Sequence, residues 1–198
     1  MSDQRSTDVD EVDLARSREY SLLSVLLLRS PDAQFLRQLA ALSADTSPIG
    51  AAHSALAEVA RRLDGQRVAR EYFGLFVGVG RGELLPYASF YLTGSLYGRP
   101  LSVLRQRLRS LGIEPVAGLQ EPEDHAGVLC EIMAGLTSGA IAAPPNASRE
   151  FFVEHLAPWM GRFFRDLERA ESADFYASVG MLGRSFIDIE IEALALPA

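Results

Sequence analysis

The sequence predicts an all-α protein, a single globular bundle of about nine to eleven helices that could divide into two lobes. Apolar residues recur at spacings of three and four along most of the 198-residue chain, which is the period of a helix face. Prolines and glycines interrupt this pattern where helices would begin and end. No convincing run of alternating apolar and polar residues is present, so we expect no sheet.

Composition narrows the class of protein. The chain is 48% hydrophobic and 23% charged, which allows a sizeable core in one domain or in two joined lobes. Its formal net charge of −7 argues against binding to DNA or RNA, which requires a basic face, and suits a cationic partner better. The single cysteine, Cys130, lies among apolar residues, so we expect a buried thiol.

The first residues differ from a targeting signal. Residues 1–12 are acidic and polar, without the basic start and apolar run of a secretory signal. We expect a flexible acidic tail there and an all-helical domain over residues 13–198. No apolar stretch approaches the twenty residues of a membrane span, so the expected location is the cytoplasm.

In the first half of the chain, local signals predict four helices and a loop. Ser30-Pro31 and Ser47-Pro48 each join a capping serine to a proline, which is typical of a helix start. The helix expected over Gln66–Val77 is apolar on all sides, so we expect it in the middle of the core. Glycines and prolines between Gly78 and Pro100 predict a long loop or short turns. Four helices are expected. The first spans Val12–Arg29, the second runs from Ser30-Pro31 through Leu42, the third runs from Ser47-Pro48 to about Leu63, and the fourth spans Gln66–Val77.

The second half continues as helices around one connector. Leucines at helical spacing predict a helix over Pro100–Leu111, ended by Gly112. Residues 113–120 are the best candidate for a hinge between two lobes. Further helices are expected after His125, over Glu150–Leu156, from Pro158-Trp159, and from Asp174, which we expect to cap the last helix.

The segment Glu121-Pro122-Glu123-Asp124-His125 is the strongest candidate for a functional site. A proline and acids suit the first turn of a helix, but a histidine is not required there. A histidine beside a carboxylate titrates near neutral pH and can hold a partner by charge-assisted hydrogen bonds. The alternative is that Asp124 and His125 only cap and cover their helix.

A groove can be built from these acids and from the aromatic residues of the preceding loop. The rings between Tyr87 and Tyr97 would form its floor, and the acidic segment with His125 would form its polar rim. Such a groove suits a peptide with paired arginines followed by apolar residues, because guanidinium groups bind carboxylates and stack on rings. The alternative is that the tyrosines fill the core and the acids form a solvated face.

Enzymatic signatures are mostly missing, so we do not expect an enzyme or a resident cofactor. There is no phosphate loop with its lysine, no zinc spacing of two histidines on one helix, and no nucleophile elbow. Two other readings remain open: an all-helical metal-dependent hydrolase with Asp124, His125 and His155 as ligands, and a scaffold that binds a folded partner through the same surface.

Several motifs, in order, resemble the TorD-like family of redox-enzyme maturation chaperones, from the first helix onward. They are Glu71-Tyr72 with Leu75-Phe76, Leu85-Pro86-Tyr87 with Ser89 and Tyr91-Leu92-Thr93-Gly94, Gly98-Arg99-Pro100-Leu101, Leu111-Gly112-Ile113, Glu121-Pro122-Glu123-Asp124-His125 and His155-Leu156-Ala157-Pro158-Trp159. The segment from Gly78 to Leu84 departs from some relatives because it has no tryptophan.

The resemblance implies an all-helical cytoplasmic chaperone that binds the twin-arginine leader of a molybdopterin-dependent oxidoreductase, prevents its premature export and assists cofactor insertion. It implies a leader-binding motif at Pro122, Asp124 and His125, with Tyr87, Ser89 and Tyr91 as neighbours. Together with Glu121 and Glu123 these are the expected leader-binding residues. Some relatives imply weak guanine nucleotide binding, for which Arg99, Arg105 and Arg109 are candidates, and a monomer or a domain-swapped dimer.

Overall fold

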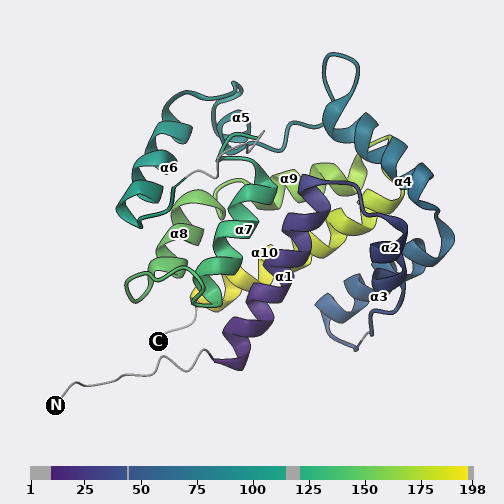
Figure 1. The fold of residues 1–198 in the computed structure, drawn as a ribbon, viewed down its shortest axis with the longest axis horizontal. Coiled ribbons are helices and arrows are strands. Elements are labelled where there is room, and N and C mark those ends of the chain that lie inside the picture. The colour runs from purple at the N-terminus through teal and green to yellow at the C-terminus, as the bar shows by residue number, and fades with distance from the viewer. Residues whose placement is uncertain (1–9, 44, 115–120, 196–198) are drawn as a thin grey trace.

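The computed structural model describes residues 10–43, 45–114 and 121–195. Over these ranges the chain forms ten α-helices, one π-helical turn (η1) and no strand, so the all-α prediction is confirmed (Figure 1). The elements are α1 (Glu11–Leu28), α2 (Ala33–Ala40), α3 (Pro48–Arg62), α4 (Gly65–Tyr72), η1 (Phe73–Val77), α5 (Ala88–Thr93), α6 (Gly98–Ser110), α7 (Ala126–Thr137), α8 (Ala147–His155), α9 (Met160–Arg169) and α10 (Phe175–Ala195).

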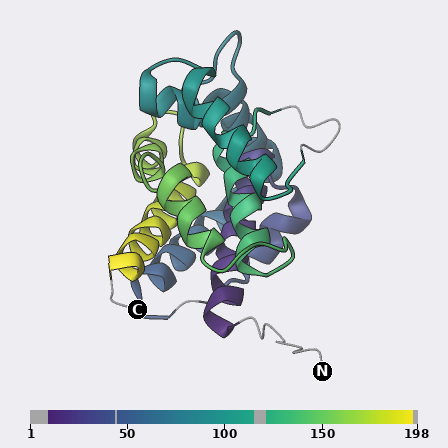
Figure 2. The same ribbon diagram turned by 90° about the vertical axis from the view of Figure 1, so that its left-hand side faces the viewer.

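The helices pack around a central group. α1 lies along α7, and α10 lies along α9 and α3. Figure 1 shows α2 and α3 at one end of the molecule and α6 and α8 at the other. Figure 2 shows the teal α5–α6 region covering one end of the bundle. Buried residues from α1 through α10 form one contiguous hydrophobic cluster, which includes Tyr20, Leu129 and Phe163.

Several predicted helix ends are close to the observed ones. Ser47 caps α3 by accepting from Gly50 N, as predicted, and Gly112 follows the end of α6 with a positive φ of 68°. The second helix is capped by Asp32 rather than by Ser30. Residues 1–9 of the expected tail lie outside the described residues, but Asp10 caps α1 and Glu11 begins it. The expected hinge also falls mostly outside them, at residues 115–120.

The segment predicted as one central helix, Gln66–Val77, is two elements. α4 ends at Tyr72 and continues as the wider turn η1, which changes the face that each residue presents. Val68 and Leu75 are buried, whereas about half of the Phe73 and Val77 side-chain surfaces is exposed. The prediction that this segment is buried on all sides is therefore wrong.

The first turn of α10 is capped by a residue of another helix. Glu71 of α4 is buried, and its carboxylate accepts hydrogen bonds from the backbone N–H groups of Asp174, Phe175 and Tyr176 at 2.8, 3.1 and 2.6 Å. We predicted that Asp174 would cap this helix. Its carboxylate instead binds Arg62 and Arg67, while Glu71 holds the helix start against α4.

The acidic segment precedes α7 rather than forming its first turn. His125 N donates to Pro122 O at 3.0 Å, which makes a turn, and α7 begins at Ala126 with no acid in its first turn. The prediction that Pro122 and the acids begin the helix is thus wrong. His125 is the N-cap: its Nδ1 accepts from Gly127 N at 3.0 Å.

The imidazole of His125 is neutral at neutral pH. Only 3% of its surface is exposed, and burial lowers the pKa of the side chain from 6.5 to about 4, although Glu121 and Asp124 act in the opposite direction. A neutral ring can accept at Nδ1, whereas an imidazolium cannot. The expectation that His125 titrates near neutral pH is therefore wrong.

We predict that Glu71→Ala lowers the free energy of unfolding by about 2 to 4 kcal/mol, because it leaves three amides at the buried start of α10 without their acceptor. Glu83→Ala is the matched control, since exposed Glu83 also accepts from two amides, those of Glu171 and Ser172, where water can replace it. Urea unfolding measures both, and equal losses would contradict the burial argument.

We also predict that stability falls as the pH decreases from about 6.5 towards 4. In this range the unfolded chain binds a proton at His125 and the folded chain does not, so the stabilisation is complete above 6.5 and is lost as the pH approaches the folded-state pKa. The loss attributable to this residue is on the order of 2 to 3 kcal/mol.

His125→Asn is the matched variant, because its side-chain oxygen can still cap α7 but does not titrate. His155 and His53 are unchanged in this variant, so the difference between the two unfolding profiles isolates His125. Parallel profiles between pH 4 and 7 would show that His125 does not contribute.

Candidate functional site

The end of the glycine-rich loop meets the acidic segment through backbone hydrogen bonds. Tyr87 and His125 form an isolated antiparallel bridge. Ala126 N donates to Pro86 O at 2.8 Å, and Ala88 N donates to Asp124 O at 3.0 Å. The tyrosine-rich segment and the Asp124–His125 corner therefore lie together, although the bonded residues Ser89 and Asp124 are 35 positions apart in the sequence.

Asp124 also caps α5, a helix within the segment predicted as loop or short turns. Tyr87 occupies the N-cap position of α5 without a side-chain cap bond of its own. Instead Asp124 Oδ2 accepts from Ser89 N at 2.9 Å. Asp124 is 1% exposed, and its other carboxylate oxygen, Oδ1, has no hydrogen-bond partner in the described structure. This orphaned oxygen is a candidate acceptor for a ligand.

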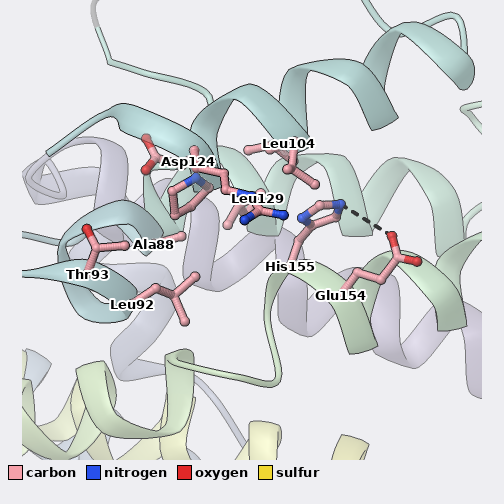
Figure 3. Close-up of a pocket in the computed structure, with 11 residues that line it drawn as sticks. Ala88, Leu92, Thr93, Leu104, Asp124, Leu129, Glu154 and His155 are labelled. Carbon is pink, nitrogen blue, oxygen red and sulfur yellow. Dashed lines mark ion pairs between the residues drawn. The ribbon is translucent and has the colours of Figure 1, made fainter. Parts of the chain in front are cut away.

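An open groove of about 420 Å³ lies beside this corner, between α5, α6, α7 and α8. Its walls are mostly apolar. Figure 3 shows Asp124 and Thr93 on one side, His155 and Glu154 on the other, and Leu104 and Leu129 between them. The lining residues are Ala88, Leu92, Thr93, Arg99, Pro100, Val103, Leu104, Asp124, Leu129, Glu154 and His155.

A smaller cavity, of about 170 Å³, adjoins the groove because Asp124 lines both. Its other lining residues are Tyr87, Leu96, Tyr97, Glu121 and Pro122. Tyr87 donates its hydroxyl hydrogen to Glu121 Oε2 at 2.6 Å, and burial raises the pKa of the phenol well above its usual value. The phenol therefore stays protonated and fixes the Glu121 carboxylate.

Two of the expected site residues are occupied by contacts within the protein. Arg105 of α6 binds Glu123 through Nε and Nη2, at 2.9 and 2.8 Å from the two carboxylate oxygens, and lowers the pKa of Glu123. Ser89 is fully buried, and its Oγ accepts from Tyr97 N at 3.0 Å. Glu123, expected as a polar anchor of the groove, is therefore already paired with Arg105 in this structure.

The ring of Tyr91 lies against α9 instead of beside Asp124. It packs on Trp159 and Phe163, with ring centroids 5.4 and 5.9 Å away, and its hydroxyl donates to Asp166 at 2.9 Å. Its carbonyl oxygen accepts from Arg162. In this structure Tyr91 fastens α5 to α9.

Of the eleven residues that line the groove, sequence reasoning had placed only Asp124 among the leader-binding residues. Leu92 and Val103 are 44% and 48% exposed, and both line the groove. Val103 could have been found, because it is an apolar residue out of phase with the buried leucines of α6. His155, considered above only as a possible metal ligand, ends α8. Among the described residues its Nε2 has no hydrogen-bond partner, and it lies 3.6 Å from Glu154 Oε2.

The residues proposed for metal or nucleotide binding are dispersed or occupied. Within residues 10–43, 45–114 and 121–195, no three histidine, cysteine or acidic residues are grouped to hold a metal ion. His125 Nδ1 is already used by Gly127 N. Among the candidate arginines, Arg105 binds Glu123 and Arg99 lines the groove. Of the helices described, none is long and apolar enough to cross a membrane.

The chain is similar to several known proteins. The chain is 26% identical to the chaperone protein TorD of Shewanella loihica, over 96% of this chain and 97% of that protein. It is 29% identical to the chaperone protein TorD of Vibrio cholerae, over 67% of this chain and 65% of that protein. With a protein named "Probable Tat proofreading chaperone DmsD" from Haemophilus influenzae it shares 29% identity, over 59% of this chain and 57% of that one.

A solved structure shares the fold. It belongs to a protein from Archaeoglobus fulgidus whose name is that of a redox enzyme maturation protein, with a TM-score of 0.56 and 22% identity, over 87% of this chain and 93% of that one. These relatives are named as chaperones and maturation proteins, not as enzymes. The family model described as nitrate reductase delta subunit matches residues 42–165, more than half of the 198 residues. The chain therefore belongs to the nitrate reductase delta subunit family.

Proposed function

We propose that this protein is a cytoplasmic chaperone that binds the twin-arginine leader of a molybdopterin-dependent oxidoreductase. In this proposal it retains the client until the cofactor has been inserted and so prevents premature export. The observation that carries the proposal is the apolar groove joined at Asp124 to an acidic cavity. The names of the relatives, chaperone protein TorD and Tat proofreading chaperone, support it.

The arrangement matches the chemistry of such a leader, in which basic residues precede an apolar stretch. Leu92, Val103 and Leu104 offer an apolar wall to that stretch. Glu121 and Asp124 offer carboxylates to the basic end, and a net charge of −7 attracts a cationic segment from solution. Because His125 is buried and neutral, its part is to hold the corner in place as the cap of α7, and it supplies no charge.

We predict that Leu92→Gln and Val103→Gln each weaken binding of a twin-arginine leader peptide about tenfold or more, because a buried apolar side chain contributes about 1.5 to 3 kcal/mol. Glutamine is uncharged, so the change tests apolar contact without altering attraction to the basic end. Calorimetric titration measures the affinity. Ile191→Gln on α10, where the side chain is similarly exposed at 43%, is the control and should bind as the unmodified protein does.

Retained affinity for the leader peptide in both groove variants would show that the peptide binds elsewhere.

A pull-down with the client protein distinguishes a chaperone from a scaffold. A chaperone that recognises the leader loses the client when the leader is deleted, whereas a scaffold for the folded partner retains it.

A further inference from the structure

The smaller cavity beside the groove has the features of a site for one cationic side chain. Its six lining residues include two carboxylates, Glu121 and Asp124, and no arginine or lysine. Asp124 is 1% exposed. Among the described residues its Oδ1 has no hydrogen-bond partner, whereas Oδ2 accepts from Ser89 N. A buried carboxylate oxygen without a donor is costly, so a ligand that supplies one is favoured there.

The second carboxylate of the cavity is held in position. Tyr87 donates its hydroxyl hydrogen to Glu121 Oε2 at 2.6 Å, and this bond leaves the remaining acceptor positions of the carboxylate for another donor. The cavity volume of about 170 Å³ is well below the 420 Å³ of the groove, which suits a single side chain rather than a stretch of peptide.

Tyr97 borders the same cavity in a conformation that tyrosine rarely adopts. Its φ and ψ are 68° and −140°, outside the regions open to residues with a Cβ, and its N–H is held by Ser89 Oγ at 3.0 Å. The residue is 58% exposed. Glycine would fit this backbone without strain, so a tyrosine here places an aromatic residue at the cavity that Glu121 also lines, at a cost in stability.

We infer that this cavity binds one guanidinium group of the leader's arginine pair, and that Tyr97 is the residue that distinguishes arginine from lysine. This inference rests on the proposed leader binding. A planar guanidinium carries five donors in a fixed fork, so it can bind both carboxylates and stack on a ring at once. An ammonium group is a compact, strongly hydrated charge and satisfies this geometry less well.

The test is calorimetric titration with leader peptides in which each arginine of the pair is replaced singly by lysine or by citrulline. We expect the unmodified protein to prefer arginine about tenfold at one of the two positions. Tyr97→Gly and Glu121→Gln should each reduce that preference to about threefold or less. Leu92→Gln lies in the groove only, so it should weaken all the peptides equally and leave the preference unchanged.

Thermal unfolding distinguishes a loss of arginine recognition from a loss of folded stability. Tyr97→Gly should unfold at a higher temperature than the unmodified protein, because glycine relieves the strained backbone. Its preference for arginine should nevertheless be reduced. An unchanged preference in Tyr97→Gly, or in Glu121→Gln, would overturn the inference and leave the proposed leader binding intact.

A second experiment, an NMR titration with small compounds, does not depend on binding of the leader. N-acetylarginine amide at millimolar concentration should shift the NMR signals of Tyr97 and Glu121 in the unmodified protein, and N-acetyllysine amide should shift them less. No arginine-dependent shift would overturn the inference. If the arginine compound produces these shifts but no leader peptide binds, the proposed function fails and the guanidinium site remains.

Discussion

The candidate site depends on one buried carboxylate, that of Asp124. Its Oδ2 accepts from Ser89 N and its backbone oxygen accepts from Ala88 N, so the start of α5 is fixed beside the start of α7. The next residue, His125, then caps α7. Both cavities share Asp124 as a wall. The position of α5, the shape of the groove and the acidity of the smaller cavity therefore all follow from where this one side chain lies.

Sequence reasoning succeeded where the determining contact is local. The start of α3 at Ser47-Pro48 and the end of α6 before Gly112 are set by residues within one turn of the helix end. It failed where the contact is distant. Glu71 caps α10 from more than 100 residues away, so the nearby Asp174 was the natural but incorrect choice.

The contrast between local and distant contacts also explains which features of the candidate site could be predicted. The proximity of the tyrosine-rich segment to the Asp124–His125 corner could be expected, and the structure has it. The helix α5 could not, because its cap comes from Asp124, 35 residues away, and the glycines around it favour a loop. Burial of Asp124 and His125 was also hidden, since it is produced by packing and not by the polarity of the segment itself.

A chain of two hydrogen bonds links this buried carboxylate to the most strained residue of the site. Asp124 binds the amide of Ser89, and the hydroxyl oxygen of Ser89 binds the amide of Tyr97. Ser89 is fully buried, so water does not compete with either bond. Backbone strain of about 1 to 3 kcal/mol persists only where surrounding contacts hold it in place. The contacts that bring α5 to α7 thus also hold the exposed Tyr97 at the edge of the smaller cavity. This is why a largely buried Asp-His corner can determine the shape of an open binding surface.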